Sequence, residues 1–106
     1  MTWVYLLIAG LLEIVWATFL KLSVGFSKLG YSVITVLGMI ASFYFLSKSL
    51  EKLPLGTAYA IWTGIGALGA VIVGVVFFNE EISLQKIVFT LFLLVGLIGL
   101  KISSSQ

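Results

Sequence analysis

The sequence contains no cysteine and no histidine, and charged residues occupy only 9% of its 106 positions. The two absent residue types exclude disulfides, thiolate chemistry, histidine metal sites and histidine pH switches. We therefore expect neither a metal site nor a cofactor, and no enzymatic activity. No P-loop pattern indicates an ATP-driven pump. Proton chemistry near neutral pH has to come from a carboxylate in an unusual environment.

Hydrophobic residues make up 61% of the chain. Charged residues make up only 9%, whereas they average about 25% in soluble proteins. This composition is typical of an integral membrane protein surrounded by lipid. Six basic residues against four acidic ones are too few and too dispersed for a nucleic-acid surface. The first twenty residues lack the basic start of a signal peptide, and Glu13 interrupts their apolar run, so we expect them to be retained as a membrane span.

Four apolar segments are long enough to cross a bilayer as helices. Pro54 suits the first turn of the third helix, and Ser83 is placed to cap the fourth. The uncharged part of the fourth segment is short, so Lys86 and Lys101 have to reach the membrane surface or be sheltered by packing. We predict one all-α transmembrane domain over residues 1–106 with spans at about 3–22, 30–49, 55–78 and 84–102, followed by a polar tail.

Glu13 is the only acidic residue inside a predicted span. At about 1.5 Å per residue it lies roughly 15 Å beyond Trp3, close to the bilayer midplane. An acid at this depth is unfavourable by at least about 2.5 kcal/mol, so it indicates a site for ions, protons or a cationic substrate. A structural ion pair with a lysine of another helix is the alternative.

Small and aromatic residues are predicted to surround Glu13. Gly10 and Trp16 share its face of the first helix, and Ser42, in the middle of the second span, is placed to donate a hydrogen bond to the acid. Aromatic faces around an acid form a cation site, although packing explains each aromatic equally well when it is taken singly. In the third span, the aromatic residues on one face are Tyr59 and Trp62.

Lysines are divided equally between the two sides of the predicted bundle. Because an excess of Lys and Arg normally sets orientation, this balance predicts that both orientations occur, unless another feature fixes one of them. No internal repeat is visible, so two copies inserted in opposite directions would supply the inverted halves on which many transporters depend. The side with the termini carries Lys48, Lys52 and Lys101, and the other carries Lys21, Lys28 and Lys86.

Such an antiparallel dimer would bring two Glu13 carboxylates towards one cavity. Burial and mutual repulsion both disfavour the ionised pair, so protons and a cation would compete for it. Small residues at positions 66, 70 and 74 suit close helix approach, and Gly96 and Gly99 suit a dimer seam, although simple packing explains both patterns as well.

The segments AGLLEIVWATFLKLSVGF and PLGTAYAIWTGIG resemble the small multidrug resistance transporters, and the likeness covers essentially the whole chain. Trp16, the GALGA segment at 66–70 and Lys101 are similar to the guanidinium-exporter subtype. The resemblance implies an antiparallel, dual-topology homodimer in the cytoplasmic (inner) membrane of a bacterial cell. It implies export of guanidinium in exchange for protons by alternating access.

The resemblance also assigns roles to residues. Glu13 would bind substrate and proton, Trp16 and Ser42 would orient the carboxylates, and the cavity would be lined by Gly10, Tyr59 and Trp62. Guanidinium suits such a site because its N–H groups match a carboxylate bidentately. The sequence leaves open whether substituted guanidines are accepted. A broader exporter of quaternary ammonium cations, an uncoupled pore and a structural bundle are the alternatives.

Overall fold

The computed structural model describes residues 1–104, and residues 105–106 of the predicted tail lie outside this range. Its four helices are α1 (Thr2–Leu22), α2 (Leu29–Leu50), α3 (Leu55–Phe77) and α4 (Leu84–Ser104). Within residues 1–104 there is no strand, and all four helices are long and apolar enough to cross a membrane. The predicted all-α class with four apolar helices is therefore confirmed. α4 continues to Ser104, beyond the end predicted near residue 102.

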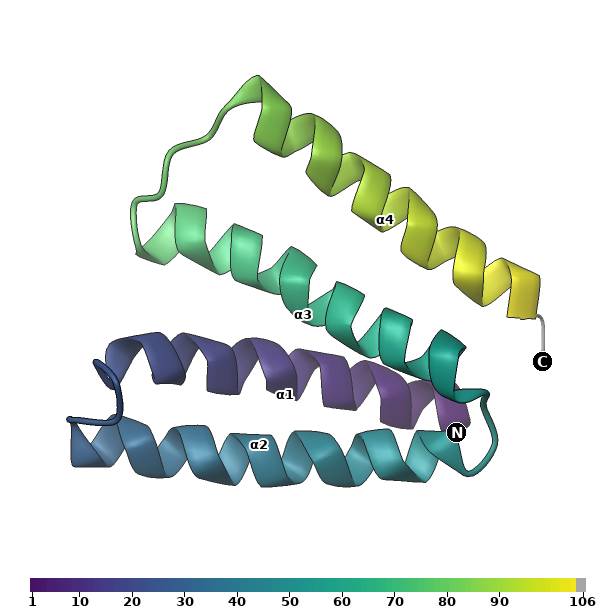
Figure 1. Cartoon of the computed structure of the whole chain (residues 1–106), viewed down its shortest axis with the longest axis horizontal. Coiled ribbons are helices and arrows are strands. Elements are labelled where there is room, and N and C mark those ends of the chain that lie inside the picture. Colours follow the sequence, from purple (N-terminus) through teal and green to yellow (C-terminus); the bar gives the residue numbers. More distant parts are fainter. Residues whose placement is uncertain (105–106) are drawn as a thin grey trace.

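Consecutive helices run in opposite directions, and their order across the molecule is α2, α1, α3, α4 (Figure 1). α1 packs against both α2 and α3, whereas α4 packs along α3 on the outside. The two chain ends lie at the same end of the bundle, beside the α2–α3 connection (Figure 1). The described chain measures 42 × 35 × 17 Å, so it is a slab roughly one and a half helix diameters thick with two broad faces.

Local sequence signals set the helix ends. Pro54 is the N-cap residue of α3, with φ −61° and ψ 147°, so the helix begins directly after it. The Ser83 hydroxyl accepts a hydrogen bond from the Lys86 backbone N–H at 3.1 Å, which confirms the predicted cap of α4. In the α1–α2 connection, Ser23 Oγ donates to the Leu20 carbonyl at 2.7 Å and accepts from Phe26 N–H at 3.0 Å.

The buried core is small and comes from the first three helices and the α2–α3 connection. None of the α4 side chains at 84–103 is buried, so this helix contributes only partly covered side chains such as Leu97. Some buried hydroxyls are satisfied within their own helix, as where Ser49 Oγ donates to the Leu46 carbonyl at 2.7 Å. The buried apolar residues are Leu6, Ala9, Leu46, Leu53, Ala58, Ile61 and Trp62.

Small residues allow α1 and α3 to approach closely. A methyl group placed at Gly10 would come within 2.7 Å of Ile65, and one at Gly69 would overlap Ile14. On α4, by contrast, Gly96 and Gly99 have open space beside them. Their predicted place in a dimer seam stays a prediction.

Candidate functional site

Glu13 lies on the side of α1 that faces α3 and is partly buried there. A methyl group at Gly66 would overlap its carboxyl group, so the carboxylate occupies space left by a missing side chain. Glu13 Oε1 is buried and has no hydrogen-bond partner among residues 1–104. The ion pair found in this range joins Lys48 and Glu51 at 3.8 Å, far along the chain at the end of α2. A structural ion pair of Glu13 within one protomer is therefore not supported.

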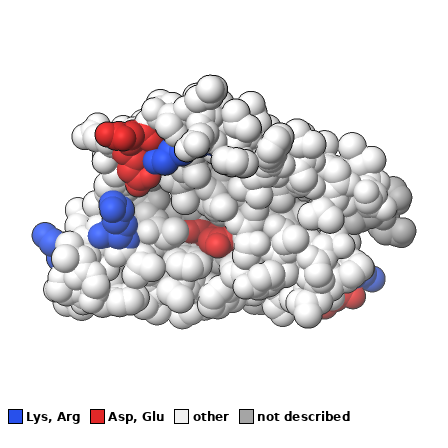
Figure 2. Space-filling view, turned by 45° about the horizontal axis from the view of Figure 1, so that its top comes forward, with Lys and Arg blue, Asp and Glu red and all other residues white. Residues whose placement is uncertain are grey.

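The charged groups on the surface agree with this position. Figure 2 shows an isolated acidic group in the middle of a broad uncharged face, whereas the remaining charges gather near the ends of the molecule. Three of the four glutamates lie outside the helices, at positions 51, 80 and 81. An acid held among apolar side chains in mid-membrane is a functional site by default, since its burial is unfavourable without a ligand or partner.

Trp16 follows Glu13 by one turn and faces α2. Its Cβ would lie 2.9 Å from a methyl group at Gly38, and its ring meets Phe43 edge-on with centroids 6.4 Å apart. The indole Nε1 of Trp16 is buried without an acceptor in the described chain. One protomer thus holds an unused buried acceptor and an unused buried donor on neighbouring turns of α1. Leaving such groups unpaired is unfavourable by about 1–3 kcal/mol each.

Ser42 is fully buried between three helices. Its hydroxyl donates to the Ala9 carbonyl of α1 at 2.7 Å and accepts from Trp62 Nε1 of α3 at 3.0 Å. Within an α-helix the Ala9 carbonyl also accepts from the N–H four residues later, which belongs to Glu13. Ser42 therefore supports the turn that carries Glu13 through its backbone. Within this protomer the Ser42 hydroxyl donates to Ala9 and not to the carboxylate. The expected hydrogen bond from Ser42 to the carboxylate stays a prediction.

Aromatic rings extend from Trp16 to the exposed edge of α3. Phe43 lies between the two indoles, with its centroid 5.7 Å from that of Trp62. Trp62 in turn lies 5.4 Å from Tyr59. Trp62 is only 6% exposed and Tyr59 is 52% exposed, so the row leads from the interior to the surface of the protomer. Both residues occupy one face of α3, as their spacing predicts, and their role in a cavity wall stays a prediction.

The structure adds two residues to this site. The spacing of small residues predicts that Gly66 is a packing residue, and Gly66 also begins the GALGA segment that is similar to the guanidinium-exporter subtype. Its spacing of four from Trp62 is the sequence signal for a place in the site. The other added residue is Phe43, which directly follows Ser42 and begins the aromatic run at 43–45. Gly10 is buried in the α1–α3 contact against Ile65. Its predicted place in the cavity wall is not tested by this contact within one protomer.

Four apolar helices, with one carboxylate midway along the first of them, are typical of a small multi-pass membrane protein that moves protons or other cations. Residues 1–94 match the family model described as Small Multidrug Resistance protein. The chain therefore belongs to the small multidrug resistance family, in agreement with the resemblance of its motifs. It is a multi-pass protein of the bacterial inner membrane.

Curated relatives align with nearly the whole chain. A protein of Yersinia pseudotuberculosis named guanidinium exporter is 51% identical over 104 residues, which cover 98% of this chain and 100% of the relative. Guanidinium exporters of Escherichia coli K12 and Salmonella typhimurium are each 50% identical over 104 residues, covering 98% of this chain and 99% of each relative.

Proposed function

We propose that this protein exports guanidinium in exchange for protons, by alternating access in an antiparallel homodimer. The observation that carries the proposal is the pair of buried, unused groups on α1, Glu13 Oε1 and Trp16 Nε1. A membrane interior offers neither group a partner, so a ligand or a second copy has to supply one. The names of the curated relatives, at 50–51% identity, support guanidinium as the substrate.

Guanidinium chemistry suits an unpaired carboxylate. The ion is planar and presents parallel N–H donors that a carboxylate accepts in pairs, and such charge-assisted bonds are stronger than neutral ones. Glu13 offers the acceptor, and the Trp16 indole can donate to a carboxylate and so fix its angle. A quaternary ammonium ion donates no hydrogen bonds and would depend on the aromatic row alone.

Two Glu13 carboxylates in one cavity would explain coupling to protons. Like charges close together in an apolar setting repel, and either a proton or a cation relieves that repulsion. The two ligands then exclude each other at the same atoms. The cation and the protons then occupy the single site in turn, the cation on its way out and the protons on their way in.

The distribution of lysines and the exposure of α4 support the antiparallel arrangement. Three lysines lie towards each end of the bundle, so the positive-inside rule favours neither orientation. α4 has no buried side chain at 84–103, which leaves it free to pack against a second copy. Two copies related by a two-fold axis in the membrane plane would present equivalent pathways to both sides.

Proton movement in liposomes tests the proposal. The purified protein is reconstituted and exposed separately to guanidinium and to tetramethylammonium, with Glu13→Gln as the matched control of nearly the same size. We expect guanidinium to drive proton movement in the wild type and none in Glu13→Gln. Equal responses to both cations would move the assignment to a broader multidrug exporter. Guanidinium flux without proton movement would indicate a pore and overturn coupling.

A further inference from the structure

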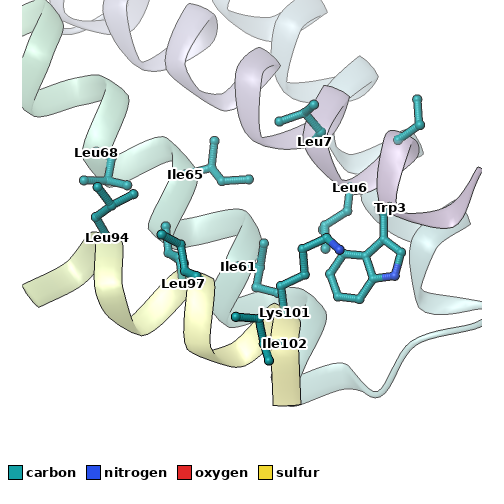
Figure 3. Close-up of a pocket in the computed structure, with 12 residues that line it drawn as sticks. Trp3, Leu6, Leu7, Ile61, Ile65, Leu68, Leu94, Leu97, Lys101 and Ile102 are labelled. Atoms are coloured by element: carbon teal, nitrogen blue, oxygen red, sulfur yellow. The ribbon is translucent and has the colours of Figure 1, made fainter. Parts of the chain in front are cut away.

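A long apolar groove lies between α1 and α4, with α3 forming part of its wall, and it is apart from the Glu13 site. We call this the α4 groove; its volume is about 470 Å³ (Figure 3). Its walls are formed by aliphatic side chains from all three helices, including Leu7, Ile65, Leu94 and Ile98. Leu7 and Ile98 are about half exposed, so the groove opens sideways to the surroundings of the protein.

One end of the α4 groove has a different character. Among the described residues, Lys101 is the only charged one that lines the groove, and Figure 3 shows its side chain reaching towards Trp3 of α1. The Lys101 ammonium lies 4.9 Å from the centroid of the Trp3 ring. Tryptophan and lysine at a helix end mark the level of the lipid headgroups. Packing on Trp3 is one of the two alternatives predicted for Lys101, and its reach to the membrane surface stays a prediction.

We propose that the α4 groove binds an anionic phospholipid, with an acyl chain along α4 and the phosphate group on Lys101. The apolar length of the groove matches a hydrocarbon chain, and the lysine at its surface end matches a negative headgroup. Within residues 1–104 no carboxylate forms an ion pair with Lys101. An ammonium carries three donors, so contact with one ring face leaves donors for a phosphate.

A lipid fits this groove better than a second copy of the chain does. A protein surface over the groove would have to cover the Lys101 charge, which is unfavourable unless an acid meets it. A lipid instead keeps its headgroup and the ammonium together at the water boundary. A zwitterionic lipid also carries a phosphate, but its own cation competes with Lys101 for that phosphate. The proposed site therefore prefers a net negative headgroup, such as that of phosphatidylglycerol.

Fluorescence quenching by brominated lipids tests the proposal, because Trp3 lies at the end of the α4 groove. The whole protein is reconstituted in mixtures of phosphatidylglycerol and phosphatidylcholine in which one or the other carries bromine. We expect Trp3 to be quenched by brominated phosphatidylglycerol with about fivefold preference at equal mole fraction. The preference should be absent in Trp3→Phe, whose remaining tryptophans are Trp16 and Trp62.

Variants at the two ends of α4 distinguish a specific lipid site from non-specific attraction of lipid to surface charge. Lys101→Gln should remove the preference, whereas Lys86→Gln, on the same helix but outside this groove, should keep it. Lys101→Arg should keep it too, and this variant applies if Lys101→Gln does not fold. Ile98→Phe fills the groove without adding a tryptophan and should weaken the preference while Lys101 is intact. Equal quenching by both lipids, no quenching by either, or a preference that survives Lys101→Gln or Ile98→Phe would overturn the proposal.

Discussion

Gly66→Ala probes the central claim that the Glu13 carboxylate depends on a missing side chain. The three atoms closest to a methyl group at position 66 all belong to Glu13, and the farthest of them, Cγ, lies at 2.9 Å. Ordinary carbon contacts are about 3.5–4.0 Å, so the carboxyl group has to move by roughly 1 Å. It is the free end of a flexible side chain and can move without disturbing the helices.

The expected effect is thus large for binding and small for stability. Alanine adds about 0.5–1 kcal/mol of helix propensity over glycine, which offsets much of any local crowding. A displacement of roughly 1 Å at a reacting or binding group can lower activity by about 100-fold. We predict that Gly66→Ala keeps its expression and thermal midpoint and loses about 10- to 100-fold in apparent affinity for guanidinium.

Guanidinium-driven proton flux in liposomes, titrated with guanidinium, measures the affinity, and thermal unfolding in detergent measures the stability. Gly30→Ala is the matched control, because a methyl group there has open space around it. It should leave the affinity unchanged and should not lower the thermal midpoint. Wild-type affinity in Gly66→Ala, or a loss of similar size in Gly30→Ala, would refute the reasoning.

Three further predictions concern the groups around Glu13. Ser42→Ala leaves the buried Trp62 indole without its acceptor, so we expect a loss of about 1–3 kcal/mol in unfolding free energy and weaker guanidinium transport. When Ser42→Ala is combined with Trp62→Phe, the two losses of unfolding free energy should be less than additive. Full additivity would contradict a hydrogen bond shared by the two residues. Trp16→Phe removes an N–H that has no acceptor in the protomer, so its thermal midpoint should fall less than that of Trp62→Phe. Its affinity for guanidinium should nevertheless fall. A larger drop in thermal midpoint for Trp16→Phe than for Trp62→Phe, with guanidinium affinity unchanged, would show that Trp16 is structural. Because protons and guanidinium exclude each other at Glu13, the apparent affinity should weaken as the pH falls, by up to about tenfold per pH unit for one competing proton, and a pH-independent affinity would rule out a shared site.

The sequence was sufficient to predict the helices and the acid. Uninterrupted apolar stretches of bilayer length have one stable backbone solution in a membrane, and Glu13 is visible because everything around it is apolar. Ser83 likewise caps α4 where its position predicts. These features depend on local sequence alone, which is why composition and spacing are enough to find them.

The details of the site depend on how each helix is rotated about its own axis. An amphipathic helix shows its inward face through its polar stripe, but helices that are apolar all round carry no such signal. Periodicity therefore could not show that Gly66 faces Glu13, that Ser42 donates to the Ala9 carbonyl, or that Phe43 lies between two indoles. Each of these contacts is set by packing between helices that are distant in sequence.

The uneven cover of the four helices has a consequence for biogenesis. α1 to α3 hold every buried side chain found in the helices at residues 1–103, whereas α4 lies outside them along α3. Chains fold from the N-terminus as they are made, so the first three helices can assemble before the last one leaves the ribosome. α4 then joins a bundle that already encloses Glu13, and its docking is a separate, late step in maturation that can proceed together with the meeting of two chains.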